Sequence, residues 1–434
     1  MPYEPVDLIE VRCWGARVGA IALDPGSGFY VFEYEPRWAA AGVQLAPTTM
    51  PVDGRERSFL FTNLPPLTYH RLPSMIADSL PDDFGNALTT AYLANKGVRA
   101  EDITPLDRLA YLGSRGMGAL EFHPGRGPQT RKSTAIHLSE LVVAARSALA
   151  GEIVSERGTT DAIKHLIAVG TSAGGARAKA VVALNPGTGE LRSGQVPVDP
   201  GFEPWLLKLD GVSADLDLGG SGHYGRIEFA YAKMAVAAGI EMTECRLLEE
   251  GGRAHFMTRR FDRTADGAKI HVQSLCALGH LDFKQIGAND YAQLFQQIDQ
   301  LSLGEEARAE AFRRMVFNVA AANCDDHSKN FAFVLAEGGD WRLSPAYDVT
   351  HAYAPRSEWT QGHLMAVNGK RTAINRRDVD TVADRFAVPG ASRIVEQVLA
   401  AIDDWPHQSQ EAGVPDDVAN GVAADITQWS QPLR

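Results

Sequence analysis

The stretch that decides the fold is Asn323-Cys324-Asp325-Asp326-His327-Ser328-Lys329-Asn330. Transfer of a phosphoryl group needs a carboxylate that accepts the proton of the attacking hydroxyl, and oxygen ligands for a magnesium ion beside the phosphates. Kinases supply these groups as an aspartate and an asparagine five positions later, which is the spacing of Asp325 and Asn330. Taken alone, the segment fits a solvated loop between a helix and a hairpin equally well, because short motifs recur by chance.

A further acid follows in Ser344-Pro345-Ala346-Tyr347-Asp348. In a kinase, an aspartate at this place is the second metal ligand. The apolar run Phe331–Leu335 lies between the two motifs and predicts a strand, which would return the chain so that Asn330 and Asp348 meet. We therefore expect Asp325 to be the catalytic base, and Asn330 and Asp348 to be the metal ligands.

A glycine-rich turn precedes these motifs at 170–179, with the sequence GTSAGGARAK. Backbone N–H groups in such a turn can point at phosphate oxygens. The segment matches neither a Walker A loop nor G-x-G-x-x-G, and an ordinary surface turn before a strand explains it as well.

Lys208 interrupts the apolar run Trp205–Leu209, which predicts a strand. A lysine there is costly to bury unless it meets an anion, and a phosphate or Glu228 would serve. Glu228 lies on the helix predicted over 223–238, so we expect a structural ion pair between strand lysine and helix glutamate, in the order of a kinase. A lysine that points to solvent from a half-buried strand is the alternative.

Arg259-Arg260-Phe261 ends the strand predicted over 254–260, where a kinase joins its two lobes and binds adenine. A strand end held by salt bridges is the alternative. The order of the signals favours the kinase, because the glycine-rich turn, strand lysine, helix glutamate, linking strand, Asp-x4-Asn motif and final aspartate follow one another in kinase sequence.

Composition restricts the class of protein. The 434 residues are too many for one core and indicate two or three packed units, and the net charge of -12 disfavours independent nucleic-acid binding. We predict a helix over 75–96 and a mostly helical chain from about residue 285 onward, interrupted at 324–350. The four cysteines contain no C-x-x-C pair, which argues against a zinc site and a disulfide framework. The acidic start of the chain and the lack of an apolar run of about 18 residues predict neither signal peptide nor membrane span, and hence a cytoplasmic protein.

The combined motifs resemble those of the HipA toxin kinases. The resemblance covers nearly the whole chain, including residues 172–179, 205–209, 260–263, 325–330 and 346–348, and segments 64–67 and 80–83 of the N-terminal region. It implies an α+β, bilobed, protein-kinase-like fold that is distantly similar to the phosphoinositide kinases. We predict a β-rich N-terminal subdomain over 1–133, a kinase N-lobe with a glycine-rich phosphate loop over 134–265, and a mostly helical C-lobe with the catalytic loop over 266–434.

The resemblance also implies the nucleotide site. The ATP-binding residues would be Gly174, Gly175, Ala176, Arg177, Ala178, Lys179, Lys208, Arg259, Arg260, Phe261, His327, Ser328, Lys329, Asn330, Tyr347 and Asp348. The sequence departs from the family pattern at Arg177, Ala178 and Arg259. Ser172 resembles the serine that HipA kinases phosphorylate on themselves, and we expect a phosphate there to compete with ATP for the loop.

The implied function is that of a toxin: an ATP- and magnesium-dependent Ser/Thr kinase that phosphorylates a cytoplasmic protein, in the family an aminoacyl-tRNA synthetase, and arrests growth. The implied partner is a HipB-like helix-turn-helix antitoxin, through which the chain would meet DNA only indirectly. Two alternatives stay open. A small-molecule or lipid kinase would share the catalytic residues, whereas a pseudokinase that only binds its antitoxin would not need Asp325, Asn330, Lys208 and Asp348.

Overall fold

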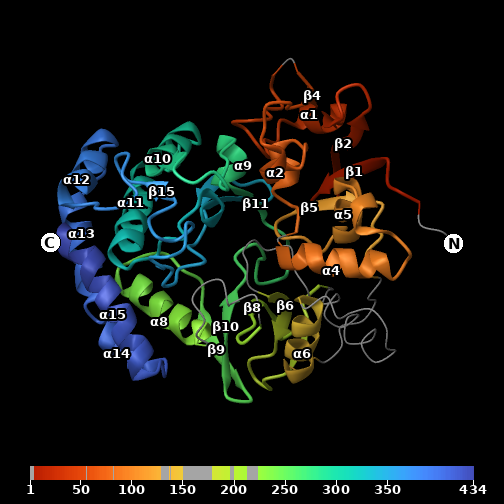
Figure 1. The fold of residues 1–434 in the computed structure, drawn as a ribbon. Coiled ribbons are helices and arrows are strands. Elements are labelled where there is room, and N and C mark those ends of the chain that lie inside the picture. The colour runs from red at the N-terminus through yellow and green to blue at the C-terminus, as the bar shows by residue number, and fades with distance from the viewer. Residues whose placement is uncertain are drawn as a thin grey trace.

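The structure, a computed structural model, describes residues 4–54, 56–81, 83–128, 136, 138–149, 178–195, 200–212 and 223–434. Figure 1 shows a β-rich N-terminal unit at one side, a second sheet in the centre and a helical unit at the other side, so that the two chain termini lie at opposite ends of the molecule. Within the described residues, no helix is both long and apolar enough to span a bilayer.

The N-terminal unit is built on an antiparallel sheet in the order β4-β3-β2-β1-β5. Its strands are β1 (Leu8–Cys13), β2 (Ala16–Asp24), β3 (Phe29–Tyr34), β4 (Ser58–Phe59) and β5 (Leu120–His123). Trp14 and Gly15 both have positive φ, which is the two-residue turn geometry that matches the twist of a hairpin. Alternate residues of β1, Ile9, Val11 and Cys13, are fully buried, because one face of the sheet packs on the core.

Short helices cover the buried face of this sheet and continue toward the centre of the molecule. They are α1 (Pro36–Ala41), α2 (Pro66–Tyr69), α3 (Ser74–Ala77), α4 (Asp83–Ala94), the 3-10 turn η1 (Ala100–Asp102) and α5 (Pro105–Leu112). The sequence predicts one helix over 75–96, but the structure has two, α3 and α4. Pro81 accounts for the break, since proline lacks the N–H that a helix interior needs and disfavours helical backbone before it.

The second sheet has the order β7-β6-β8-β10-β9 and carries the lysines that the sequence singles out. Its elements are β6 (Lys179–Leu184), β7 (Leu191–Ser193), β8 (Glu203–Lys208), β9 (Cys245–Glu250) and β10 (Arg253–Arg259), with helices α6 (Leu138–Leu149) and α8 (Tyr224–Ala237). Gly225, in the first turn of α8, leaves no room for a Cβ against the carbonyl group of Ala254. This close approach brings α8, and with it Glu228, onto the sheet.

The remaining elements form the helical unit. They are β11 (His271–Ser274), α9 (Leu275–Gly279), β12 (Asn289–Asp290), α10 (Tyr291–Gln300), α11 (Gly304–Ala320), η3 (Ser328–Asn330), β13 (Ala332–Leu335), β14 (Trp341–Leu343), β15 (Met365–Ala366), α12 (Arg376–Arg385), α13 (Ala391–Ile402), α14 (Trp405–Glu411), α15 (Asp416–Ser430) and η4 (Gln431–Leu433). Helix α11 runs through the middle of this unit, with Phe312, Met315 and Phe317 fully buried. The irregular region predicted over 324–350 extends further, because the next helix begins only at Arg376.

The strands and helices expected around the motifs are present, and the α+β class is confirmed. The predicted domain limits stay predictions, and the one near residue 133 lies outside the described residues.

Hydrogen bonds join the N-terminal unit directly to the helical unit. The hydroxyl of Tyr69 donates to the carbonyl oxygens of Cys276 and Leu281, at 2.9 and 2.7 Å. His271 of β11 lies with Nε2 2.9 Å from the carbonyl oxygen of Leu45, and its Nδ1 has no partner. His271 is fully buried, so the interface holds it as a neutral imidazole that donates from Nε2.

The buried imidazole predicts a loss of stability in acid. Burial lowers the pKa of His271 from 6.5 to about 4, against the opposing contact with Leu45. Between these values the unfolded chain binds a proton that the folded chain does not, so the free energy of unfolding falls as pH falls from 6.5 to 4. The contribution reaches about 3 kcal/mol at the acid end.

The measurement is the thermal midpoint as a function of pH for wild type and His271→Gln. As the pH falls from 6.5 to 4, the thermal midpoint of the variant is expected to decrease less than that of wild type. His407→Gln, at an exposed residue beside Glu411, is the control and should follow the wild-type slope. Parallel slopes for wild type and His271→Gln would contradict the assignment.

Candidate active site

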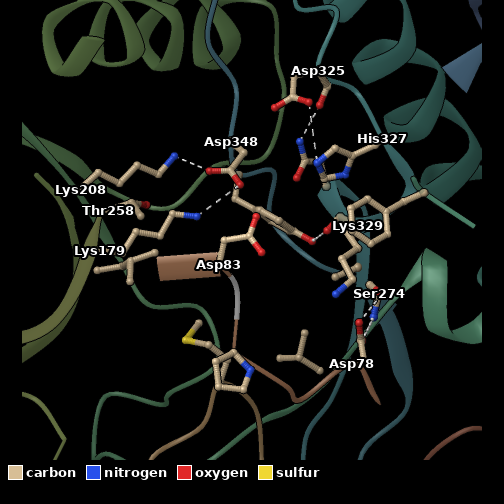
Figure 2. A pocket seen from close by; sticks show the side chains of 18 of the residues that line it. Asp78, Asp83, Lys179, Lys208, Thr258, Ser274, Asp325, His327, Lys329 and Asp348 are labelled. Carbon is tan, nitrogen blue, oxygen red and sulfur yellow. Dashed lines mark hydrogen bonds and ion pairs between the residues drawn. The ribbon is translucent and has the colours of Figure 1, made fainter. Parts of the chain in front are cut away.

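A pocket of about 590 Å³ lies where the three units meet, a volume suited to a small ligand such as a nucleotide. The second sheet contributes Lys179, Leu206, Lys208 and Thr258, and the helical unit contributes Asp325, His327, Lys329, Asn330, Tyr347, Asp348 and Trp359. The N-terminal unit supplies a third wall, with His70, Pro81, Asp83, Asn86 and Met117. Figure 2 shows Lys179, Lys208, Asp83 and Asp348 directed toward the same space.

Two lysines on neighbouring strands meet carboxylates from two other elements. Lys179 of β6 and Lys208 of β8 are partners in the sheet register, so their side chains lie on one face. Nζ of Lys208 contacts carboxylate oxygens of both Glu228 and Asp348, and Nζ of Lys179 lies 4.0 Å from Oδ2 of Asp348. Both lysines are almost fully buried, so the solvent-facing alternative for Lys208 is wrong.

The two neighbouring lysines keep the carboxylate of Asp348 ionised. Burial by itself would raise the pKa of Asp348, but the ammonium groups of Lys179 and Lys208 outweigh it and hold the pKa well below its usual value. Asp348 also has a φ of 53°, in the left-handed region that residues with a side chain rarely adopt. The backbone thus holds an ionised carboxylate toward the lysines at a local conformational cost.

The loop 323–330 separates the roles of its two consecutive aspartates. Asp326 is fully buried and accepts hydrogen bonds from the hydroxyl of Tyr291 at 2.8 Å and the backbone N–H of Leu364 at 2.8 Å, and it lies 2.9 Å from Nδ1 of His363. Asp325 faces the pocket with its side chain one third exposed. Asp326 therefore anchors the loop, and Asp325 is the carboxylate that a ligand can reach.

Three groups hold Asp325. The indole N–H of Trp359 donates to Oδ1 at 2.7 Å, Nε2 of His327 lies 3.8 Å from the same oxygen, and the amide of Asn330 donates to the Asp325 carbonyl oxygen at 2.7 Å. Burial raises the pKa of Asp325, and the contacts of His327 and Trp359 oppose this shift. Because Oδ1 is engaged, Oδ2 is the oxygen that is oriented for a further partner.

The linking strand is fixed by one buried carboxylate. Asp262 accepts two hydrogen bonds from the Arg260 guanidinium at 2.8 and 2.7 Å, one from Arg263 at 2.8 Å and one from the backbone N–H of Gly118 at 2.7 Å. Burial would raise the pKa of Asp262, but the two arginines outweigh it and lower the pKa far below the usual value. Asp262 therefore ties the segment that follows β10 to the N-terminal unit, and the Phe261 ring lies 5.6 Å from the Tyr347 ring at the pocket wall.

Comparison with known proteins identifies the family. The model of the HipA-like C-terminal domain matches residues 171–405, and the model of the HipA N-terminal domain matches residues 9–123. The chain belongs to the HipA family. A solved structure of the Shewanella oneidensis MR-1 toxin–antitoxin system, a complex of HipA, HipB and its operator DNA, aligns with this HipA-family chain over 98% of its length and 96% of the matched chain, with a TM-score of 0.67 and 16% identity. The kinase-like bilobed fold that the sequence predicts is thus confirmed.

Two curated relatives of the HipA-family chain come from Sinorhizobium fredii. They are named "Putative kinase Y4mE" and "Putative kinase Y4dM", with 27% identity over 160 residues and 25% identity over 170 residues. The matches cover 34% and 36% of this chain, and the chain spans only 37% and 39% of the length of these relatives.

The structure brings together most residues that the sequence assigns to nucleotide binding. The pocket lining includes Lys179, Lys208, Arg259, Arg260, Phe261, His327, Lys329, Asn330, Tyr347 and Asp348. Ala178 and Ser328 lie behind it: Ala178 packs in a core cluster, and the Ser328 hydroxyl is buried without a partner. Ser172, Gly174, Gly175, Ala176 and Arg177 lie outside the described residues.

Sequence patterns missed two parts of the pocket. Trp359 contacts Asp325 from a segment 34 residues away that carries no motif. The wall from the N-terminal unit, including His70, Asp83 and Asn86, comes from segments more than 200 residues distant from the loop 323–330. Cues existed only for the segments 64–67 and 80–83 of the family resemblance, which contribute Leu67, Pro81 and Asp83 to the lining.

The donor set fits a hard cation together with phosphate. Since Nδ2 of Asn330 is bonded to the Asp325 carbonyl oxygen, the amide oxygen of Asn330 is its remaining acceptor, and Asp348 adds carboxylate oxygens. Magnesium commonly binds one or two such protein oxygens with phosphates and water. In the described part of the chain, no cluster of three or more His, Cys, Asp or Glu side chains could hold a metal ion without such help.

The Asp262 cluster predicts a large stability effect. Asp262→Asn removes the charge that balances two buried arginines and is expected to lower the free energy of unfolding by about 3–5 kcal/mol. Asp299→Asn is the matched control, because Asp299 pairs with Arg308 at 2.9 Å on the surface, where the loss is expected to be about 0–1 kcal/mol. The measurement is chemical unfolding followed by tryptophan fluorescence, and equal losses in the two variants would contradict the role of Asp262.

Proposed function

We propose that this chain is a toxin-type protein Ser/Thr kinase that uses ATP and magnesium. The observation that carries the proposal is the convergence of Asp325, Asn330, Asp348 and the Lys208–Glu228 pair, from four separate segments, on one pocket of nucleotide size. Magnesium would neutralise phosphate charge in such a site, where Asn330 and Asp348 are its protein ligands.

The roles of the residues follow from their contacts. Asp325 accepts the proton of the substrate hydroxyl through Oδ2, while Trp359 holds Oδ1. Lys208 and Lys179 stabilise phosphate charge from the floor of the pocket, and Glu228 fixes the position of Lys208. Arg259, Arg260 and Phe261 form the adenine side, where the Arg260 guanidinium is occupied by Asp262 and cannot itself bind the base.

The partners and target are part of the same proposal. The HipB-like helix-turn-helix antitoxin is supported by the solved relative, which is a complex of HipA with HipB and operator DNA. The proposed target is a cytoplasmic protein such as an aminoacyl-tRNA synthetase, whose phosphorylation would arrest growth. Ser172 is the proposed site of autophosphorylation, at which a phosphate would exclude ATP from the glycine-rich loop.

The test of the function is Asp325→Asn. The amide keeps the shape of the side chain but cannot accept the hydroxyl proton, and loss of a general base lowers kcat by about 10²–10⁴-fold. The measurement is transfer of labelled phosphate from magnesium-ATP to proteins of a cell lysate, beside growth on induction of each variant. Wild-type labelling by Asp325→Asn would reject Asp325 as the base. Labelling of metabolites or lipids without proteins would favour a different kinase class.

The hydrogen bond from Trp359 predicts a specific kinetic defect. Trp359→Phe removes the bond to the carboxylate, worth about 1.5–3 kcal/mol for a charged partner, and is expected to lower kcat about tenfold or more with an unchanged KM for ATP. Trp341→Phe is the matched control, because the Trp341 indole donates to the carbonyl oxygen of Gln44 in the N-terminal unit, and neither residue lines the pocket. An equal effect of both variants would mean that Trp359 acts only through folding.

A further inference from the structure

Most cationic side chains of the pocket contact a carboxylate. Lys179 and Lys208 contact Asp348, Arg259 lies 3.4 Å from Glu203, and Arg260 forms a two-pronged ion pair with Asp262. Such pairing is expected in a chain with a net charge of -12, and it offsets the cost of removing the cations from water.

Lys284 and Lys329 depart from this pattern. Among the described residues, no carboxylate lies within ion-pair distance of either ammonium group, although both side chains line the pocket. The two ammonium groups share one aromatic ring, since Nζ of Lys329 lies 5.1 Å and Nζ of Lys284 lies 5.8 Å from the Phe283 ring centre. Figure 2 shows Lys329 on the side of the pocket opposite Lys179 and Lys208, so the charge of Lys329 is not part of the Asp348 cluster.

A third cation, Arg108, lies next to the pocket wall, because it contacts Asn86 of the lining. Arg108 is half-buried, and its guanidinium donates to the neutral amide of Asn86 at 2.9 Å instead of to a carboxylate. All three cations affect the pKa of His70, an exposed residue of the pocket lining. Partial burial lowers the pKa of His70, Lys284, Arg108 and Lys329 lower it further, and the carboxylate of Asp83 opposes them. Three cations and one carboxylate therefore act on the imidazole of His70.

Two further carboxylates in this region accept hydrogen bonds from other groups. Asp78 accepts hydrogen bonds from the backbone N–H and hydroxyl of Ser274, at 2.7 and 2.6 Å, and Asp282 accepts from the hydroxyl of Thr68. Lys284 is exposed, whereas Lys329 and Arg108 are half-buried. Half-buried cations without a counter-ion are unfavourable, and an anionic group of a ligand would supply the missing partner.

The position of this surplus charge relative to Asp325 fixes what kind of ligand it meets. The Phe283 ring lies 5.3 Å from the His327 ring, and His327 Nε2 lies 3.8 Å from Oδ1 of Asp325. Two rings, those of His327 and Phe283, thus lie between the proposed base and the ammonium groups. An extended peptide advances roughly 3.3 Å per residue, so a chain whose hydroxyl meets Asp325 would place a side chain about two to four residues away over the lysines.

We propose that Lys284 and His70, beside Lys329, form an acceptor-side subsite that binds a carboxylate of the protein substrate. The substrate class is then an acidic segment, with Asp or Glu about two to four residues from the phosphorylated hydroxyl. The inference deepens the kinase function proposed above and rests on it. Arg108, which is bonded to Asn86 of the pocket wall, adds a further positive charge on this side of the molecule.

The experiment compares Lys284→Glu with a matched control, Lys233→Glu. Lys233 is exposed on α8, lies 5.2 Å from the Phe229 ring and is absent from the pocket lining, so it reproduces the lysine–phenylalanine contact without the subsite. Each full-length protein is incubated with magnesium-ATP and dephosphorylated peptides from a whole-proteome digest, and the phosphorylated sites are identified by mass spectrometry.

Wild type and Lys233→Glu are expected to enrich Asp and Glu near the modified Ser or Thr, whereas Lys284→Glu should lose this preference or favour Lys and Arg. Sites without acidic enrichment in wild type, or an unchanged preference in Lys284→Glu, would overturn the subsite. A variant that changes only the KM for ATP would also overturn it, because Lys284 would then bind the nucleotide.

A binding measurement separates the subsite from the activity. Fluorescence anisotropy with a labelled peptide of Glu residues around one Ser, in the presence of magnesium-ADP, is expected to give at least about tenfold weaker binding for Lys284→Glu than for Lys233→Glu, with affinity falling as salt rises. Equal binding by both variants overturns the subsite. Absence of phosphorylation by wild type, together with the expected anisotropy result, would instead reject the kinase function and retain the anionic-segment site.

Discussion

The contact of Lys208 with two carboxylates is the interaction on which the arrangement of this molecule depends. Glu228 comes from α8, which packs on the second sheet, and Asp348 comes from the helical unit, so one ammonium group joins both lobes. A buried cation costs several kcal/mol unless it is paired, and Lys179 next to it adds a like charge. The two lobes must therefore stay close enough for Asp348 to reach the sheet, and this closeness creates the pocket.

The N-terminal unit belongs to the same electrostatic framework. Asp262, in the segment that connects the lobes, accepts a hydrogen bond from the backbone N–H of Gly118. Asp78 holds Ser274 at the start of α9. These contacts place Pro81, Asp83 and Asn86 against the pocket. The unit therefore acts as a wall of the site, and a change at its interface would alter the pocket.

Two neighbouring aspartates illustrate how burial assigns roles. Asp325 and Asp326 have the same chemistry, but Asp326 is saturated by Tyr291, His363 and the backbone of Leu364. Asp325 keeps an exposed oxygen and a raised pKa. The fixed anchor next to the reactive group limits the motion of the loop, which is the usual requirement for a positioned base.

The sequence by itself determined the elements that are encoded locally. The strand around Lys208, the helix of Glu228, the spacing of Asp325 and Asn330, and the family follow from patterns a few residues long, because hydrophobic periodicity and motif spacing are local properties. The sequence also contained the signal for the helix break, Pro81, although the helix predicted over 75–96 included this residue.

Only the tertiary structure decided which of these groups meet. It distinguished Asp325 from Asp326, buried Lys208 against two carboxylates, brought Trp359 to Asp325, and left Lys284 and Lys329 without a carboxylate among the described residues. These facts depend on contacts between segments that are tens to hundreds of residues apart in the sequence. The charge state and the partners of a side chain are set by all the groups packed around it, and a local sequence pattern does not contain that information.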